Sequence, residues 1–194
     1  IPSYVSKARK AYNSWCFSAP HDRSEILRSA AKKLISKQKE LATLHTKESG
    51  KIILQSLKEI SGAVGLLEAN AHIGQYKSGT VAPTGGLPNG ERDLTIIERV
   101  PLGIVVCVIP FNFPIELAFE KASAAIVAGN VVLLKPPPQN PLATIMAAQT
   151  LIDSGLPKNV LQILPGGNKF SEALCSESGV DAVSLTGSVN AGIS

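Results

Sequence analysis

The first half of the chain carries the hydrophobic spacing of α-helices. Between residues 22 and 44, apolar residues recur at steps of three, four and seven positions, which places them on one helical face. The residues of this stripe are Leu27, Ala31, Leu34, Leu41 and Leu44. Gly50 follows at a position typical of a helix C-terminus, where a residue without a Cβ adopts a left-handed conformation easily. A second helical pattern covers residues 51–76 despite two internal glycines, so about the first 80 residues are predicted to be helical.

The second half alternates short apolar runs with helical patterns. Residues 78–93 are dense in Gly and Pro and predict loop and turn, and residues 95–100 (TIIERV) predict a short strand. Four apolar runs then begin near Ile104, Val131, Val160 and Ala182. The helical patterns between them cover 115–128, 141–154 and 169–176. Asn140 before Pro141 suits a helix start, and Gly155 suits a helix stop. This alternation predicts an α/β fold, a Rossmann-like parallel sheet with flanking helices, preceded by the N-terminal helical segment.

Composition and charge indicate a globular protein and argue against two classes of partner. The 194 residues are 44% hydrophobic and 18% charged, as in a soluble globular protein and unlike a disordered or fibrous one. The net charge of +4 comes from 19 basic and 15 acidic residues spread without a long basic run, which argues against nucleic-acid and membrane partners. No apolar run approaches the roughly 20 residues that cross a bilayer.

The cysteines predict neither a disulfide framework nor a metal site. Cys16, Cys107 and Cys175 are far apart, odd in number and without CxxC spacing. Cys107 lies within the apolar run IVVCVI and is expected in the core. This usage fits a reducing compartment, and residues 1–15 are charged and amphipathic, unlike a signal peptide. We therefore expect a cytoplasmic protein without a metal ion.

Candidate chemistry follows the ends of the predicted strands, where parallel α/β sheets bind ligands. The first of these segments is PFNFP, in which Asn112 stands between Pro110 and Pro114. This pattern is compatible with ordinary turn chemistry, and also with an amide held rigid because something must be hydrogen-bonded there. The two readings stay open on these residues alone.

The other strand ends offer groups that suit a nucleotide. Lys135 ends the second strand before three prolines, either as a solvated side chain or as an ammonium for hydroxyls or phosphate. Gly187 and Ser188 follow the fourth strand, where Ser is either an ordinary helix N-cap or part of a phosphate site. Gly166 and Gly167 after the third strand are a weaker candidate. The chain contains neither a GxGxxG motif nor a P-loop.

Three segments in this order resemble the aldehyde dehydrogenase superfamily: IPFNFPIELAFEKASAAIVAGNVVLLKP, GLPKNVLQILPGG and VDAVSLTGS. The corresponding family signatures are Pro-Trp-Asn-Phe-Pro, Gly-Asn followed by an apolar strand and Lys-Pro, Gly-Leu-Pro, and Phe-Thr-Gly-Ser. SWCFSAPHDRSEILRSAAKKL and KESGK also resemble the family's N-terminal helices. The resemblance implies helices over 1–82 that pack on the cofactor domain, a loop and strand of an oligomerisation hairpin over 83–101, and a partial NAD(P)-binding Rossmann-like domain over 102–194.

The resemblance also implies roles for individual residues. Asn112 falls on the amide that donates a hydrogen bond to the oxyanion formed when a cysteine thiolate attacks the aldehyde. Lys121 aligns with a lysine implicated in proton movement in some members. The cofactor-binding residues that the resemblance implies are Ile109, Phe111, Lys135, Pro138, Gly167, Gly187 and Ser188. Among them Lys135 is expected at the adenosine ribose, Ser188 with Gly187 at the pyrophosphate, and Ile109 with Phe111 near the nicotinamide and substrate.

Two departures from the family pattern bear on function. Pro138 stands where many NAD-preferring members have a Glu that holds the ribose hydroxyls and repels a 2′-phosphate, so the cofactor is expected to be NAD or NADP, with NADP tolerated or preferred. The sequence also stops at Ser194, before the family's nucleophilic Cys and general-base Glu. None of the three cysteines falls where the nucleophile belongs. We therefore expect residues 1–194 to be inactive alone.

The activity that the resemblance implies is NAD(P)-dependent oxidation of a small-molecule aldehyde to a carboxylic acid. The full-length protein is expected to form a homo-oligomer. Two alternatives stay open. One is an acylating, CoA-dependent or a non-phosphorylating glyceraldehyde-3-phosphate dehydrogenase of the same superfamily. The other is a truncated, non-catalytic nucleotide-binding paralogue.

Overall fold

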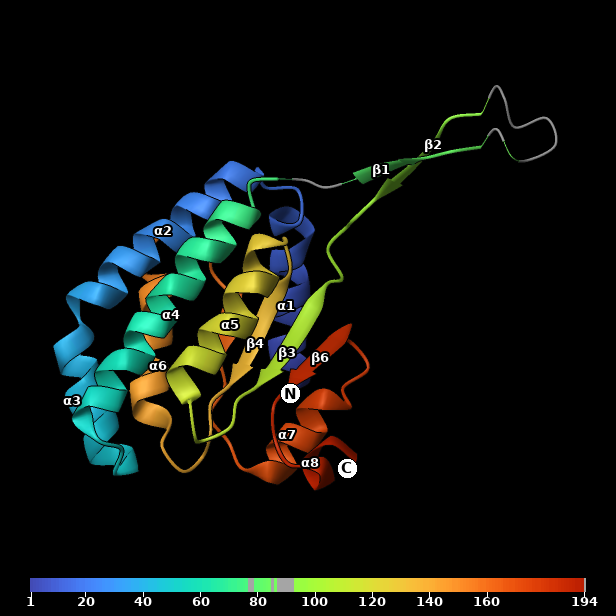
Figure 1. Ribbon diagram of the computed structural model, residues 1–194. Helices are drawn as coiled ribbons and strands as arrows, with labels where there is room; N and C mark the ends of the chain where they lie inside the picture. Colours follow the sequence, from blue (N-terminus) through green and yellow to red (C-terminus); the bar gives the residue numbers. More distant parts are fainter. Residues whose placement is uncertain (77–78, 85, 87–92, 194) are drawn as a thin grey trace.

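The computed structural model describes residues 1–76, 79–84, 86 and 93–193. Its first part is helical, as the hydrophobic spacing predicts (Figure 1). The four helices are α1 (Pro2–Trp15), α2 (Pro20–Ser36), α3 (Gln38–Ser49) and α4 (Ile53–Ile73). Helix α4 runs unbroken through its two glycines. Gly50 ends α3 with a φ of 74°, the left-handed conformation expected of it.

The buried stripe of residues 22–44 belongs to two helices and not to one. The backbone leaves helical geometry at Lys37 (φ −96°, ψ 6°), which separates α2 from α3. Leu27, Leu34 and Leu41 are fully buried and Leu44 is partly buried. The apolar spacing continues in phase across Lys37, and for this reason the pattern alone does not reveal the break.

The second part contains a four-stranded parallel sheet. Its strands are β3 (Ile104–Val108), β4 (Val131–Lys135), β5 (Leu161–Ile163) and β6 (Ala182–Leu185). They lie in the order β5-β4-β3-β6. All residues of β3 and β4 are buried, which explains why these strands read as continuous apolar runs. The strand positions predicted from the sequence are confirmed, and so is Cys107 as a core residue.

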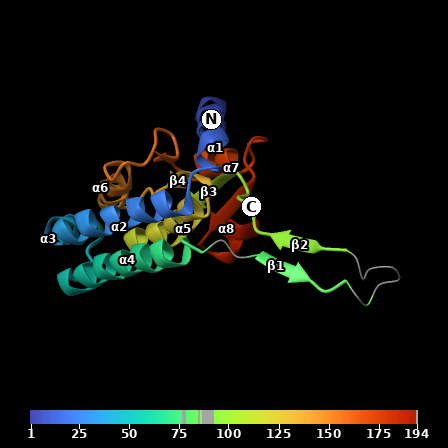
Figure 2. The same cartoon turned by 90° about the horizontal axis from the view of Figure 1, so that it is seen from above.

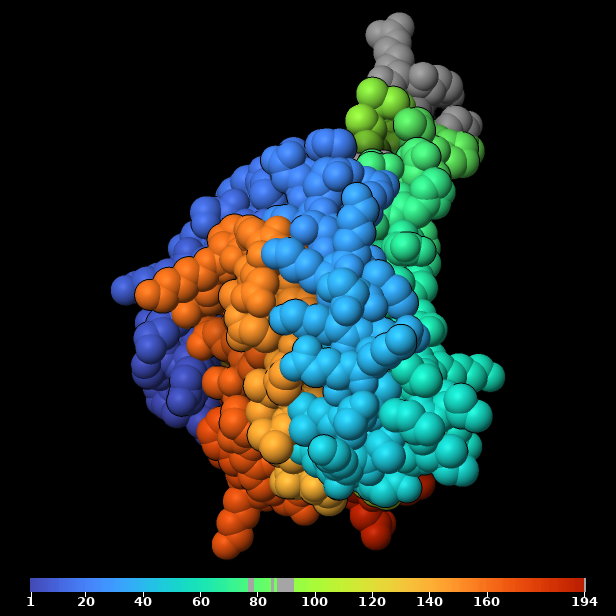
Figure 3. All heavy atoms as spheres, turned by 90° about the vertical axis from the view of Figure 1, so that its left-hand side faces the viewer, coloured from blue at the N-terminus to red at the C-terminus, as the bar shows by residue number. Residues whose placement is uncertain are grey.

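Helices cover both faces of this sheet. The connecting helices are α5 (Pro114–Val127), α6 (Pro141–Ile152) and α7 (Asn168–Cys175), and α8 (Val189–Ile193) follows β6. Figure 2 shows α5 and α6 on one face and α1 with α7 on the other. Helices α2 and α4 pack on α5 and α6 as an outer layer. In Figure 3, which faces this layer, α6 lies directly beside α2 and α3.

A two-stranded hairpin projects from this body (Figure 1). Strand β1 (Gly79–Ala82) pairs antiparallel with β2 (Thr95–Glu98). The prediction of a strand at TIIERV is confirmed, whereas the prediction of loop and turn over 78–93 is wrong for residues 79–82. The rest of that prediction lies partly outside the described residues, at 78, 85 and 87–92. The boundary expected at residue 82 falls between the two paired strands, so the hairpin begins before it.

None of the helices in the described ranges combines the length and apolar character needed to cross a membrane. Likewise, no group of three or more His, Cys, Asp or Glu side chains in this part of the chain is arranged to hold a metal ion.

Candidate functional site

The sheet brings the predicted site segments to one edge. Strands β3, β4 and β6 are neighbours and run parallel, so the residues that follow them emerge side by side. The Ile109 N–H donates to the Lys135 carbonyl (3.1 Å), and the Thr186 N–H donates to the Val108 carbonyl (3.4 Å). From β3 the chain first adds β4 and β5 on one side of the sheet, and it then returns to add β6 on the other side of β3. Such a reversal of strand order is where open α/β sheets bind ligands.

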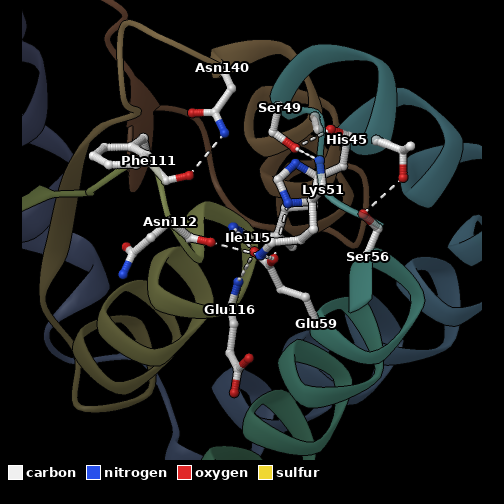
Figure 4. Close-up of polar contacts among 12 residues, drawn as sticks. His45, Ser49, Lys51, Ser56, Glu59, Phe111, Asn112, Ile115, Glu116 and Asn140 are labelled. Carbon is white, nitrogen blue, oxygen red and sulfur yellow. Dashed lines mark hydrogen bonds and ion pairs between the residues drawn. The ribbon is translucent and has the colours of Figure 1, made fainter. Parts of the chain in front are cut away.

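Asn112 lies in the loop between β3 and α5 with its side chain exposed. In Figure 4 this side chain points away from Lys51 and Glu59. Its amide makes no hydrogen bond to any residue that the structure describes. The backbone of the loop, in contrast, is held on both sides: Lys51 Nζ donates to the Asn112 carbonyl (2.7 Å), and Asn140 Nδ2 donates to the Phe111 carbonyl (3.0 Å). The loop is fixed while the amide stays available to a ligand.

Beneath this loop lies the buried carboxylate of Glu59. Its Oε1 accepts hydrogen bonds from the backbone N–H groups of Ile115 (2.9 Å) and Glu116 (3.4 Å) in the first turn of α5. Its Oε2 accepts from His45 Nε2 (3.0 Å) and Lys51 Nζ (2.5 Å). Burial alone would raise the pKa of Glu59, but the hydrogen bonds from His45, Lys51 and Ile115 outweigh burial and hold the pKa below its ordinary value.

An ionised Glu59 also settles which ring nitrogen of His45 carries a hydrogen. A carboxylate only accepts, so Nε2 must be the donor in the contact with Glu59. The other nitrogen, Nδ1, is buried and has no hydrogen-bond partner in the described part of the chain. His45 itself is fully buried, as is the side chain of Glu59. The cluster is therefore part of the protein interior, with only Lys51 reaching toward the surface.

The sequence reasoning missed Lys51 and Glu59 as part of this site. One signal for Glu59 was present, because it falls on the buried stripe of α4 among apolar and small residues. The members of that stripe are Ser56, Glu59, Ile60, Ala63, Leu67 and Ala71. An acid on an apolar helical face is expected to be paired. No comparable signal marked Lys51, which stands at the corner between α3 and α4.

Lys135 is buried, with 3% of its surface exposed. The reading of a solvated lysine at a strand exit is therefore wrong. Its ammonium makes no hydrogen bond or ion pair within the described part of the chain. Burial lowers the pKa of Lys135, and Cys175 nearby opposes this effect. A partly desolvated ammonium without a hydrogen bond to described residues is a candidate for an anionic or hydroxyl-bearing ligand.

The remaining candidates differ in their surroundings. Ile109 is buried, whereas Phe111 is 60% exposed and Pro138 is exposed. Gly167 is exposed at the start of α7, and a Cβ added to it would meet nothing within 4 Å. Lys121 Nζ donates to Ser184 Oγ on β6 (3.3 Å), which directs it toward the sheet and away from the Lys51 and Glu59 contacts.

At the end of β6, the structure shows one of the two readings of Ser188 directly. Ser188 Oγ accepts a hydrogen bond from the Ala191 N–H (3.2 Å), as a helix N-cap does. Gly187 and Ser188 are both exposed. Their backbone therefore remains accessible at the end of the strand next to β3.

Cys107 and Cys175 lack the environment of an activated nucleophile. Burial raises the pKa of Cys107 to about 12, an effect that Lys121 only partly opposes. Burial also raises the pKa of Cys175, although Lys135 lies near it. Cys16 is a free thiol at the end of α1. Nucleophilic cysteines instead have a lowered pKa in an electropositive setting.

Two surface hollows lie away from the carboxyl edge of the sheet. One, of about 300 Å³, is lined by Arg28, Lys32, Glu68 and His72 on α2 and α4. The other, of about 500 Å³, is lined by five residues of α3 together with Met146 of α6. The polar groups that the strand ends bring together line neither of them.

Comparison with known proteins identifies the family. The model of the aldehyde dehydrogenase family matches residues 1–194. The 3-sulfolactaldehyde dehydrogenase of Priestia aryabhattai is 35% identical over 175 residues, which cover 90% of this chain and 37% of that protein. The NADP/NAD-dependent aldehyde dehydrogenase PuuC of Escherichia coli (strain K12) is 34% identical, over 99% of this chain and 39% of its own length.

Solved structures agree with this result. The crystal structure of NADP-dependent glyceraldehyde-3-phosphate dehydrogenase from Bacillus halodurans C-125 complexed with NADP matches with a TM-score of 0.95 and 26% identity. The match covers 99% of this chain and 41% of that one. The chain thus spans about two fifths of the length of its relatives, with the parallel sheet and helices of their fold. This chain belongs to the aldehyde dehydrogenase family.

Proposed function

We propose that the carboxyl edge of β3, β4 and β6 is the cofactor groove of an enzyme that oxidises an aldehyde to a carboxylic acid with NAD(P). The observation that carries this proposal is the pairing of two unengaged groups at adjacent strand ends. Asn112 on its fixed loop and Lys135 on its largely buried side chain each present a polar group that makes no hydrogen bond to a residue in the described ranges. Family membership supports the same chemistry.

The residues at this edge fit a dinucleotide. Lys135 would bind the adenosine ribose, and Gly167 with Gly187 and Ser188 would leave the backbone accessible to the pyrophosphate. Ile109 and Phe111 would line the groove near the nicotinamide. NAD(P) would supply the hydride acceptor when bound.

The position of Pro138 favours NADP. Pro138 is exposed beside the end of β4 and brings no carboxylate to repel a 2′-phosphate. Lys135 is close by in sequence and forms no ion pair with the residues that the structure describes. One relative is an NADP/NAD-dependent enzyme, and one structural neighbour was solved with NADP. We therefore propose that NADP is accepted at least as well as NAD.

Asn112 would act as the oxyanion donor. Attack of a thiolate on an aldehyde places negative charge on the former carbonyl oxygen, and a preorganised N–H donor stabilises that charge. The Asn112 side chain would be such a donor, and the anchored backbone of its loop supports this role. The thiolate would come from outside residues 1–194, because burial raises the pKa of Cys107 and Cys175 and the family resemblance places the nucleophile at none of the three cysteines. Residues 1–194 are thus proposed to be inactive without that thiolate. For Lys121, a role in proton movement stays a prediction of the family resemblance.

The hairpin supports a proposal about assembly. Both strands are exposed, and their apolar side chains Val81, Ile96 and Ile97 are each more than half exposed. A projecting two-stranded sheet with open edges readily pairs with another strand. We propose that it joins subunits of a homo-oligomer, which light scattering of wild type and of a variant with Ile97→Asp would test.

The experiment that tests the function follows nicotinamide reduction by the full-length natural protein. A panel of aldehydes is offered with NAD or NADP, with and without CoA, and includes glyceraldehyde 3-phosphate. Formation of NADPH or NADH and a carboxylic acid without CoA is the expected result. A strict need for CoA would indicate an acylating enzyme. Nucleotide binding without turnover of any aldehyde would contradict the proposal and favour a non-catalytic paralogue.

A further inference from the structure

Two carboxylates from the corner between α3 and α4 occupy the N-termini of the helices that follow β3 and β4. Glu59 accepts from the Ile115 N–H of α5, and Glu48 accepts from the backbone N–H groups of Leu142 (2.6 Å) and Ala143 (3.0 Å) of α6. The first N–H groups of a helix lack partners within it and attract negative charge. Because the protein's own acids satisfy these groups, both helix starts are tied to the N-terminal helical layer.

Lys51 extends this connection to the loop that carries Asn112. Its ammonium donates to Glu59 Oε2 and to the Asn112 carbonyl, and it lies over the Phe113 ring at 4.0 Å from the centroid. Figure 4 shows it between Glu59 on α4 and the loop after β3. With 13% of its side chain exposed, Lys51 is held on three sides. The carbonyl that it binds belongs to the same residue as the proposed oxyanion donor.

Glu59 in turn has its hydrogen-bonding capacity filled. Oε1 receives two backbone N–H groups, and Oε2 receives His45 and Lys51. A carboxylate offers about four lone-pair directions, so little freedom remains for it to rotate. His45 donates from a fully buried ring and fixes the carboxylate from the side opposite the loop.

We propose that Lys51 and Glu59 are positioning residues that aim the Asn112 amide at the reacting oxygen, an inference that rests on the function proposed above. The Asn112 amide makes no hydrogen bond to a described residue, so among these residues it is the backbone of the loop that sets where the side chain starts. The bond from Lys51 to its carbonyl fixes that backbone, and Glu59 fixes Lys51. An oxyanion donor stabilises charge only if it already points to where charge develops.

The test compares Lys51→Met and Glu59→Gln with two matched controls in the full-length natural protein. Lys58→Met and Glu68→Gln make the same changes at exposed positions of α4. Gln at position 59 keeps an acceptor for the Ile115 N–H but presents an amide to His45 and Lys51. Four quantities are measured for each variant: hydrogen exchange of residues 111–116, kcat, KM for NADP and melting temperature.

In Lys51→Met, amide exchange over 111–116 is expected to rise by about 10-fold, because the loop opens locally more often. The kcat is expected to fall by about 10- to 100-fold, as slight misplacement of a catalytic group does, while KM for NADP stays within about twofold. Glu59→Gln is expected to do the same, and the controls to match wild type. Lys51→Arg, which keeps a cationic donor, is expected to recover part of the kcat.

Other outcomes overturn the inference in distinguishable ways. Unchanged exchange in Lys51→Met would show that Lys51 does not hold the loop. An unchanged kcat with increased exchange would show that loop order does not aim the amide. Should Glu59→Gln fail to fold, Lys51→Met alone decides between these results. A wild type that oxidises no aldehyde would overturn the proposed function, whereas exchange would still decide whether Lys51 and Glu59 hold the loop.

Discussion

Asn140 Nδ2 donates a hydrogen bond to the Phe111 carbonyl at 3.0 Å. This contact joins the segment after β4 to the loop after β3, two places that are 29 residues apart in the chain. Asn140 is buried, and its Oδ1 has no hydrogen-bond partner among the residues that the structure covers. The contact therefore adds a second anchor to the loop of Asn112, opposite the one from Lys51.

Replacement of Asn140 by Ala removes this anchor and leaves the Phe111 carbonyl without its donor. The free energy of unfolding is expected to fall by about 1 kcal/mol, the net value of one hydrogen bond, because the Phe111 residue is exposed and water can reach its carbonyl. Urea denaturation measures the change. Gln139→Ala, at the exposed neighbouring position, is the control and is expected to change little. Equal effects at the two positions would contradict an anchoring role for Asn140.

Gly167 and Gly166 are expected to respond differently to an added methyl group. Gly167 has a φ of −83° and open space around its Cβ direction, so Gly167→Ala is expected to leave stability unchanged and to weaken NADP binding. At Gly166 a Cβ would lie 2.6 Å from the Phe170 ring, so Gly166→Ala is expected to destabilise the fold by about 1–3 kcal/mol. Calorimetric titration and thermal melting separate the two effects. Unaltered NADP affinity in Gly167→Ala would place the pyrophosphate elsewhere.

Lys135→Met tests the buried ammonium. Met keeps the apolar stem and removes a partly desolvated charge that has no hydrogen bond to described residues, so the variant is expected to be about as stable as wild type. Its affinity for NADP is expected to fall by about 10- to 100-fold, the value of a charge-assisted hydrogen bond. The exposed Lys158→Met is the matched control. An affinity for NADP equal to that of wild type would show that Lys135 does not bind the cofactor.

The stability of wild type relative to Lys135→Met is expected to depend on pH, with a sign that follows from the lowered pKa of Lys135. Burial lowers the pKa of Lys135 below 10.5, so between the two values the unfolded state binds more protons than the folded state. Wild-type stability relative to Lys135→Met is therefore expected to rise as pH increases through the folded pKa toward 10.5. Cys175 is the titrating group beside it, and Cys175→Ser serves as the background in which to repeat the measurement. A relative stability that falls with pH would contradict the burial of the ammonium.

The lowered pKa of Glu59 predicts how stability changes at acidic pH. Its pKa is lowered from 4.5 in the folded protein, so its contribution is complete above 4.5 and is lost as pH falls toward the folded pKa. Glu59→Gln is expected to cost about 3 kcal/mol at neutral pH, as removal of one partner of a buried ion pair does. The difference from wild type is expected to shrink below pH 4.5 in urea titrations. A difference that is constant with pH would show that charge at Glu59 does not matter.

The sequence predicted the sheet well and the hairpin poorly, for physical reasons. Strands β3 and β4 are buried on both faces and appear as continuous apolar runs. Strand β1 is short, exposed and surrounded by Gly and Pro, and its pairing with β2 is set by backbone hydrogen bonds that leave no hydrophobic pattern. Local composition therefore predicted a loop where a strand lies.

The site was predicted in part for a similar reason. Asn112 and Lys135 follow apolar strands, so their positions at the sheet edge could be predicted from the fold. The residues that surround Asn112 could not be predicted in this way. The bond from Lys51 to Asn112 spans 61 residues, and the one from Glu59 to Ile115 spans 56. Such pairs form only when α4 packs on α5, and a single sequence carries no pattern that specifies that packing.

The rate of aldehyde oxidation by Asn112→Ala in the full-length natural protein tests the central claim most directly. The side chain is exposed and makes no hydrogen bond to described residues, so melting temperature and NADP affinity are expected to match those of wild type and of the control Asn13→Ala. The kcat is expected to fall by ~10²–10³-fold, the loss typical of one oxyanion donor. A kcat equal to that of wild type would contradict the assignment of Asn112 to the reacting oxygen.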